Sequence, residues 1–382
     1  MLPWLETIGF VCMWVVTVLR APAALRDRGQ RDLWLAVALI ALTTTLYQDP
    51  ISEGLSRIVG GPLHLIDLGR NLCDVAASTV LIHLVLGAAL RRQHIKPLFA
   101  AAALMMALLI FFDLTSPPHG HFNGRTPQIP VLCWYLLMGY HLIADAIVVA
   151  VCWRYWRRAR EWSVRWGLFI FGIGAAFACV LWMVFISYLI TPVPAILSYV
   201  PPVTGIEEIL QAVGAGLPIA PAVYLWAKNC GRSWILWPLW VELVTATPQV
   251  TLMRPRFRVV DTMTAVFSPE LRLYRMVIEI RDALLILTDH IAPSAIDHVR
   301  RTVENSRPEH VDALTAACLI HAAQRARRHS RTHPQTLNMA ELGGEDLEAE
   351  LTFLLHVTRA RNSALVKDFV DQLTPAGSVV VQ

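Results

Sequence analysis

Side chains that can exchange protons or bind an ion recur within one apolar stretch, between residues 63 and 90. His64, Asp67, Asn71 and Asp74 follow each other at intervals of three or four residues, which places them on one face of a helix. Arg70 lies three residues after Asp67 and four before Asp74, so it can pair with either carboxylate. Charged groups inside a membrane usually face a bundle interior or a water-filled cavity.

Two further apolar stretches carry polar groups of the same kind. His141 and Asp145 are one helical turn apart in the stretch 131–153, and Glu207 and Gln211 lie near the start of the stretch 206–226. We predict that these groups and those of residues 64–74 line one outward-opening pocket for an unknown small ligand, ion or proton. Two other interpretations are open. The groups nearest the membrane surface would simply be solvated, and the deeper ones would form hydrogen bonds between helices.

Two histidines, His119 and His121, stand two residues apart in a segment that contains Pro117-Pro118 and is expected to be a loop. Together with His64, His141 and nearby aspartates they are candidates for a metal site. Two histidines alone do not define one, so a metal-dependent membrane hydrolase is a minor alternative. The chain has no phosphate-binding glycine loop, nucleophile elbow, HExxH or kinase motif, so we expect no enzyme and no cofactor.

The composition indicates that membrane helices position these groups. Hydrophobic residues make up 55% of the 382-residue chain and charged residues only 16%, whereas charged residues are near a quarter in soluble domains. Up to Trp226 the apolar residues form runs that approach or exceed the roughly 20 residues of a spanning helix. The seven runs are Leu2–Leu19, Leu33–Tyr47, Leu63–Leu90, Leu98–Leu114, Val131–Trp153, Gly167–Ile190 and Ile206–Trp226.

Basic residues are distributed unevenly among the connections between these runs. The first, third and fifth connections contain nearly all of them, and the positive-inside rule places such connections in the cytoplasm. We therefore predict a plasma-membrane protein with its N-terminus outside and its C-terminal part inside. The residues concerned are Arg20, Arg26, Arg28 and Arg31, then Arg91, Arg92 and Lys96, and finally Arg154, Arg157, Arg158, Arg160 and Arg165.

The predicted fold is all-α. It comprises a seven-helix transmembrane domain at residues 1–228, a cytosolic helical domain at 229–374 and a disordered tail at 375–382. Ser268-Pro269-Glu270 is a typical helix start, and the helix should continue to Ile291. Further helices are expected at Glu309–Arg328 and Glu345–Val370, and the segment from Trp234 to Trp240 at the inner membrane surface. The apolar seam of the first cytosolic helix is Leu273, Val277, Ile280, Leu284, Leu287 and Ile291.

A basic run from Arg325 to Arg331 invites a nucleic-acid interpretation. No helix-turn-helix and no interleaved aromatic residues accompany it, so we do not expect nucleic-acid binding. A solvated surface, or contact with anionic lipid of the bilayer, explains the run more simply.

The helix motif L-Y-R-M-V-I-E-I-R-D-A-L-L at residues 273–285 resembles an actinobacterial family of multi-pass membrane proteins, and so does Leu236-Trp237-Pro238-Leu239-Trp240. Members of that family have about seven helices, a C-terminal domain of unknown function and the label of transporters. The resemblance implies transport but no substrate and no functional residues. From the residues alone, the motif is an amphipathic helix on which charged side chains can pair one turn apart. Its polar positions are Tyr274, Arg275, Glu279, Arg281 and Asp282.

Two classes of function fit these features about equally. A receptor or sensor-like regulatory protein needs a polar pocket and a cytosolic domain that passes a signal to a protein partner, and both are expected here. A small-solute transporter fits the family label, but transporters commonly show paired Gly/Pro breaks in matching helices. Only the last run has such a break, with Gly214, Gly216, Pro218 and Pro221. This favours the receptor, with a membrane scaffold as a further alternative.

Overall fold

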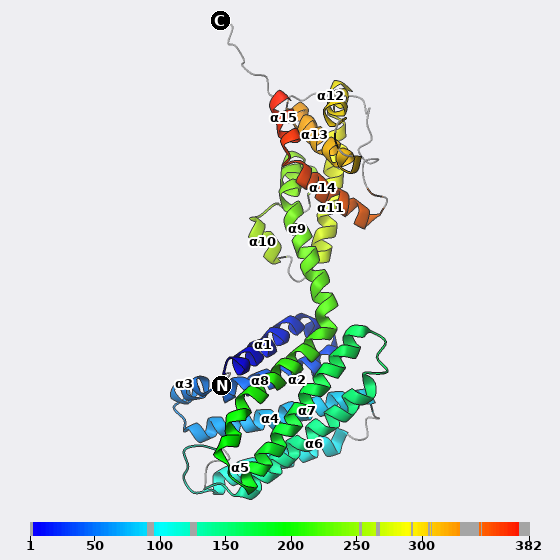
Figure 1. Ribbon diagram of the computed structural model, residues 1–382. Helices are drawn as coiled ribbons and strands as arrows, with labels where there is room; N and C mark the ends of the chain where they lie inside the picture. The colour runs from blue at the N-terminus through cyan, green and yellow to red at the C-terminus, as the bar shows by residue number, and fades with distance from the viewer. Residues whose placement is uncertain are drawn as a thin grey trace. The chain divides into compact units, whose positions relative to one another are not determined.

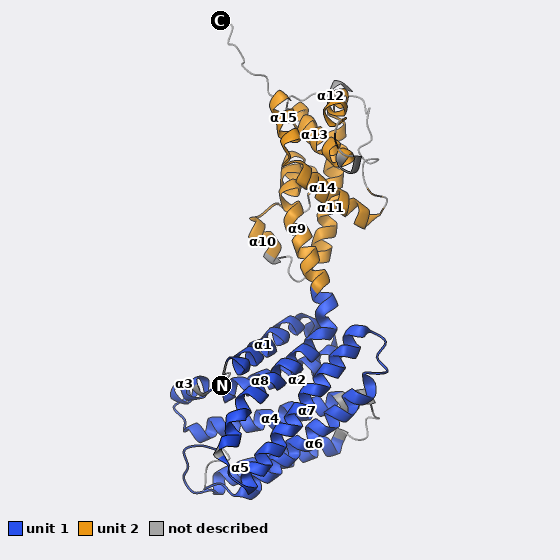
Figure 2. Ribbon diagram, viewed as in Figure 1, with its two compact units in different colours: residues 1–223 blue, residues 224–382 orange. Residues whose placement is uncertain are grey.

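The computed structural model describes residues 3–89, 95–122, 128–251, 254–264, 268–291, 293–304, 306, 308–328, 344 and 346–373. All regular elements of this described part are helices, which confirms the all-α fold class. The chain forms two compact units, Met1–Val223 and Tyr224–Gln382 (Figures 1 and 2). The predicted disordered tail, Arg91, Arg92, Arg125 and the end of the basic run lie outside the described residues.

The first unit consists of long helices joined by short segments. Its elements are α1 (Pro3–Arg26), α2 (Arg28–Tyr47), α3 (Asp49–Val59), α4 (Leu63–Ala89), α5 (Ile95–Thr115), α6 (Val131–Tyr155), α7 (Trp162–Ile190), η2 (Pro194–Tyr199), α8 (Val200–Gly216) and η3 (Leu217–Ile219). Helix α9 (Ala220–Ala246) follows η3 directly and contains the boundary between the units.

Five helical stretches are long and apolar enough to cross a membrane, and they indicate a membrane protein. They correspond to the first, fourth, fifth, sixth and seventh predicted runs, and are Trp4–Arg26, Lys96–Thr115, Val131–Tyr155, Trp162–Ile190 and Ala195–Ala246. The second and third runs are helices too, α2 and α4, but neither belongs to this set. Helix α2 begins with charged residues, and the first half of α4 carries Asp67, Arg70 and Asp74.

The first predicted connection is much shorter than expected, because α1 extends to Arg26 and α2 begins at Arg28. Arg20 is therefore a helix residue, and it is buried. Its Nε and Nη2 atoms donate to the carbonyl oxygen of Ala215 at 3.0 and 2.5 Å. Ala215 lies in the last turn of α8, where α-helical geometry gives way to the 3₁₀ turn η3. Arg20 thus binds a carbonyl at a helix end, where intrahelical partners are missing.

Helix α8 is held between α1 and α7 by glycines, which allow helices in a membrane to approach closely. A Cβ atom placed on Gly205 would lie 2.6 Å from the backbone nitrogen of Glu6 in α1. A Cβ atom on Gly214 would lie 2.5 Å from the backbone nitrogen of Phe171 in α7. Both contacts are with backbone, which cannot turn aside as a side chain can. These positions therefore require glycine.

Arginine and tryptophan gather where α6 ends and α7 begins. The Arg157 guanidinium lies 5.7 Å from the ring centroid of Trp153 and 5.3 Å from that of Trp156. Arg165 lies 5.5 Å from the Trp156 ring. Trp153 is exposed on the protein surface. Exposed aromatic rings with basic side chains at a helix end are typical of a membrane interface.

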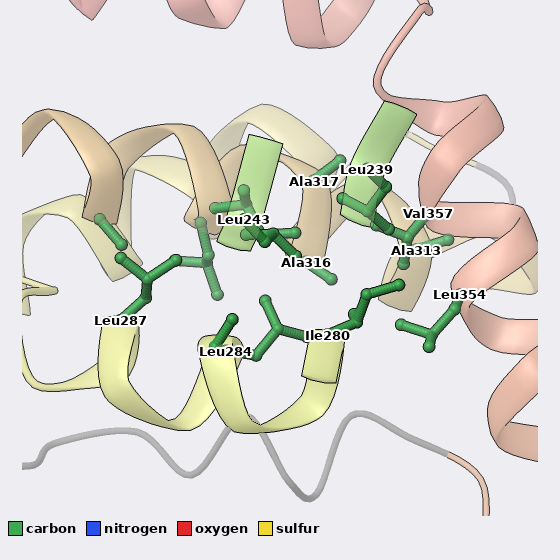
Figure 3. Packing of buried hydrophobic residues seen from close by; sticks show 14 of the residues in the cluster. Leu239, Leu243, Ile280, Leu284, Leu287, Ala313, Ala316, Ala317, Leu354 and Val357 are labelled. Atoms are coloured by element: carbon green, nitrogen blue, oxygen red, sulfur yellow. The ribbon is translucent and has the colours of Figure 1, made fainter. Parts of the chain in front are cut away.

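The second unit has a core built by most of its helices. Besides α9 it contains η4 (Pro248–Val250), α10 (Arg258–Thr264), α11 (Pro269–Thr288), α12 (Pro293–Val303), α13 (Pro308–Arg328), α14 (Leu347–Ala360) and α15 (Ala364–Leu373). Figure 3 shows leucines of α9 and α11 facing Ala313, Ala316 and Ala317 of α13. The small alanine side chains let α13 pack closely against its neighbours.

The α11 helix and its apolar seam are confirmed. The helix covers nearly all of the predicted range, and every predicted seam residue is buried, from Leu273 to Ile291. The helix expected at Glu309–Arg328 is confirmed as α13. Burial of such a seam stabilises the fold by roughly 1.5–3 kcal/mol for each fully buried Leu, Ile or Val.

One expectation for the second unit is wrong, and the structure adds to another. The predicted single helix Glu345–Val370 is two helices, because α14 ends at Ala360 and α15 begins at Ala364. The backbone N–H of Val366 donates to the Ser363 hydroxyl at 3.3 Å, which caps the new helix. The segment Trp234–Trp240 is not simply a membrane-surface segment. Helix α9 continues through it, and its Leu236, Leu239 and Trp240 side chains lie in the core of the second unit.

Candidate functional site

Asp67 of α4 is the centre of a buried polar network in the first unit. Its Oδ1 lies 3.1 Å from Nη1 of Arg70, and its Oδ2 lies 3.1 Å from Nδ1 of His121. The same Oδ2 accepts the backbone N–H of Phe122 at 3.0 Å. Arg70 also stacks on the ring of Tyr47, 4.6 Å from its centroid. Asp67 thus fixes the segment between α5 and α6 to the start of α4.

A second carboxylate, Asp113 of α5, faces two histidines. Its Oδ1 lies 3.0 Å from Nδ1 of His64 and 3.1 Å from Nε2 of His119. One ligand atom from each of these three residues lies within 4.8 Å of the others, a grouping that could hold a metal ion. The two histidines predicted as metal ligands therefore lie on different carboxylates. His119 joins His64, whereas His121 lies on Asp67.

The other predicted groups of α4 and α6 meet further along these helices. Nε2 of His141 lies 3.3 Å from Oδ2 of Asp74, within ion-pair range but without hydrogen-bond alignment. The other ring nitrogen of His141, Nδ1, lies 3.0 Å from the hydroxyl of Ser78. The imidazole stacks on the indole of Trp182 at 4.7 Å, and the indole N–H donates to Asp145 at 2.8 Å.

Helix α8 brings a third acidic group to this place. Glu207 accepts a hydrogen bond from Gln211 at 3.0 Å. It also interacts electrostatically with Asp145 and Asp74. Arg70 is a cation within electrostatic reach of Asp74, and it already pairs with Asp67.

The predicted pocket residues therefore form two sets in the first unit. His64, Asp67 and Arg70 lie with Asp113 and the segment that follows it. The second set joins α4, α6, α7 and α8 and consists of Asp74, His141, Asp145, Glu207 and Gln211 together with Trp182. We call this second set the acid–histidine network.

Two residues of these networks, Asp113 and Trp182, and the buried Arg20 contact described above were not predicted from the sequence. Asp113 stands near the end of an apolar run, next to Leu114, where a single acid could be taken for a surface residue. Trp182 is one of 13 tryptophans. Arg20 was counted as a loop residue. The signal for Asp113 was available, because an acid in a run this apolar is a functional candidate in itself.

The motif of α11 is mainly structural. Glu279 was expected on the polar face beside Arg275, but it is buried and accepts a hydrogen bond from the indole N–H of Trp240 at 2.6 Å. Arg272 covers the same indole ring at 4.3 Å from its centroid. The remaining motif residues are exposed or form an ion pair with another helix. Tyr274, Arg275 and Asp282 are exposed, and Arg281 lies 3.4 Å from Glu350 of α14.

An open cavity of about 470 Å³ lies between α13 and α14. Its wall includes Asp312, Asp346 and Glu348. Glu348 accepts a hydrogen bond from Arg232 at 2.9 Å, and this bond lowers the pKa of the carboxyl. The arginine thus already pairs with one of the wall carboxylates.

Residues 225–363 match a family described as a family of unknown function, DUF6545. The match takes in most of the second unit, including the α11 motif, so this part of the chain is a domain of unknown function. No curated protein matches the chain, and no solved structure matches it.

Proposed function

We propose that this chain is a sensor-like regulatory membrane protein, in which the acid–histidine network takes up a proton or a small cation. One observation carries the proposal. Asp74 lies 3.3 Å from His141, whose ring stacks on Trp182, and the Trp182 indole donates to Asp145, so carboxylates of α4 and α6 meet around one imidazole within the apolar first unit. Carboxylates that repel one another in a desolvated place do not all ionise without a bound proton or cation. The network is therefore suited to binding positive charge.

Helix α9 is the element through which such an event would reach the second unit. It starts in the first unit, and its later residues Leu236, Leu239 and Leu243 belong to the core of the second. A helix is a rigid element, so a displacement at one end acts on the packing at the other. A protein partner that binds the second unit would read this change.

The test uses protons as the probe. Backbone hydrogen exchange of α9 and α11 is measured on the full chain in lipid nanodiscs at pH 6 and pH 8, with correction for intrinsic exchange. We expect a several-fold change in protection between the two pH values, which Asp145→Asn abolishes. Asp282→Asn, in which an exposed carboxylate of α11 is changed, is the matched control and should respond like the wild type.

The second unit has an acid-sensitive group of its own, so the comparison between variants is essential. Burial lowers the pKa of His321, Arg361 lowers it further, and Glu242 opposes both. Because the folded state resists protonation of His321, it loses stability as the pH falls below the unfolded value near 6.5. The loss of stability caused by His321 should be the same in the wild type and in Asp145→Asn. A pH response that is equal in wild type and Asp145→Asn would contradict the proposed function.

We further propose seven spans, with α2 and α4 as the additional two, and a second unit in the cytoplasm. The excess of arginine where α6 meets α7 supports this orientation. Reporter domains fused after Arg160 and after Lys228 should both report the cytoplasm, and one fused after Pro118 should report the outside. An external signal from the Lys228 fusion would refute the topology.

Transport of a small solute is the second candidate. The 3₁₀ turn Leu217–Ile219 interrupts α8 and α9 inside one candidate span, as in the broken helices of transporters. Proteoliposomes loaded with a pH-sensitive dye separate the two functions. Luminal pH changes that need an intact Asp145 would favour proton-coupled transport, and a stable lumen together with the exchange response would favour the sensor.

A further inference from the structure

We infer that His64, Asp113 and His119 form a binding site for zinc or a similar divalent transition metal ion. The three residues come from α4, α5 and the segment after α5. Their ligand atoms converge, with the carboxylate oxygen of Asp113 at 3.0 and 3.1 Å from the two imidazole nitrogens. Around a tetrahedral zinc ion with bonds of 2.0–2.1 Å, neighbouring ligand atoms lie about 3.3 Å apart. The three ligand atoms lie within 4.8 Å of one another, so the two imidazoles would have to move closer together to complete this geometry around the ion.

The orientation of the His119 ring suits a metal ligand. Nδ1 of this ring lies 2.8 Å from the carbonyl oxygen of Pro117, which can only accept, so Nδ1 carries a hydrogen. In a neutral imidazole Nε2 then presents a lone pair, and it faces the carboxylate of Asp113. A ring N–H bound to a backbone carbonyl is also how metal-binding histidines are usually oriented.

Packing around Phe122 positions the segment that carries His119. Phe122, three residues after His119, is fully buried and packs on the ring of Trp134 at 5.3 Å between centroids. Its backbone N–H is bound by Asp67. These contacts hold the chain in place three residues after His119. Asp67 is therefore a positioning residue for the site.

Exposure and ligand type indicate which ion fits. The side chains of Asp113 and His119 are 2% and 4% exposed, but that of His64 is 22% exposed and leaves a way in. Two imidazoles and one carboxylate suit zinc, whereas magnesium and calcium prefer oxygen ligands. Three protein ligands leave one coordination position for water or another small ligand. The site differs from the acid–histidine network and does not depend on the function proposed for it.

The experiment measures zinc on the full chain in nanodiscs. The protein is stripped with a chelator, reloaded with zinc alone and freed of excess ion. Bound zinc is then determined by mass spectrometry, and affinity by competition with a chromophoric chelator. We expect one zinc ion per chain and a loss of affinity of at least about 100-fold in His119→Ala and Asp113→Asn. His121→Ala changes a histidine two residues away that lies on Asp67, and it should bind zinc like the wild type.

Two results would overturn the inference. One is a wild-type protein that retains no zinc, which would make the contact an ion pair between protonated His119 and Asp113. The other is an equal loss of zinc in His121→Ala and His119→Ala. If His119→Ala fails to fold, cobalt(II) added to the wild type decides. Intense visible absorption of a four-coordinate ion supports the site, and the weak spectrum of the aqueous ion contradicts it.

Discussion

Replacing Leu284 by Asp should unfold the second unit and leave the first unit intact. Leu284 lies in the seam of α11 and is 3% exposed. The change removes a buried side chain worth roughly 1.5–3 kcal/mol. Keeping the new carboxyl neutral at pH 7 costs about 4 kcal/mol more, since its ordinary pKa is near 3.9. The sum of about 5.5–7 kcal/mol reaches the lower part of the 5–15 kcal/mol that stabilise a typical domain, so a unit of ordinary stability loses most of its native population.

Hydrogen exchange of the full chain would measure this. Amides of α11 and α13 should lose protection in Leu284→Asp, and those of α6 and α7 should keep it. Leu285→Asp is the matched control, because Leu285 neighbours Leu284 but is 41% exposed. Its protection should stay near that of the wild type. Equal protection in both variants would mean that the seam is not the core of this unit.

Replacing Gly214 by Ala should destabilise the first unit, although alanine is the better helix former. The added Cβ would lie 2.5 Å from the backbone nitrogen of Phe171, so α7 and α8 must move apart. Overpacking of this kind costs about 1–3 kcal/mol or more. Gly139→Ala is the control, because its Cβ meets nothing within 4 Å. There the gain in helix propensity, up to about 1 kcal/mol, is unopposed.

Replacing glycine by alanine should therefore lower the stability of the first unit at Gly214, whereas at Gly139 it should preserve or raise it. Thermal unfolding in one detergent, followed by the loss of monomer on size exclusion, would compare them. We expect a lower midpoint than the wild type for Gly214→Ala and an equal or higher midpoint for Gly139→Ala. A Gly214→Ala protein as stable as the wild type would show that the α7–α8 contact is looser than described.

The features predicted best from the sequence are those that depend on a single helix. The seam of α11 follows from periodicity alone, and it was predicted residue by residue. The burial of Glu279 was missed, because its partner Trp240 is 39 residues away and periodicity says nothing about that helix. The break between α14 and α15 contains neither proline nor glycine. Asn362-Ser363 was the available signal, since both residue types favour helix N-caps.

The candidate site shows the same division. The three- and four-residue spacing of His64, Asp67 and Asp74 predicted a shared face of α4, and the structure places Asp74 in a different set from the other two. The spacing did not predict that His121 would contact Asp67 whereas His64 and His119 would contact Asp113. That division depends on where the segment after α5 folds back, and this is set by tertiary contacts such as the one between Phe122 and Asp67. Local spacing does not specify such contacts.

The contact between Arg20 and Ala215 has a consequence for the order of biosynthesis. The two residues are 195 positions apart, so the ribosome must add nearly the whole first unit before Arg20 meets its acceptor. At about 5–20 residues per second this interval is roughly 10–40 s. Until then the Arg20 guanidinium lacks its carbonyl acceptor, although its Nη1 atom can already donate to Gln30, which lies 3.3 Å away in the structure. The contact that joins α1 to the end of α8 is therefore among the last to form in the first unit.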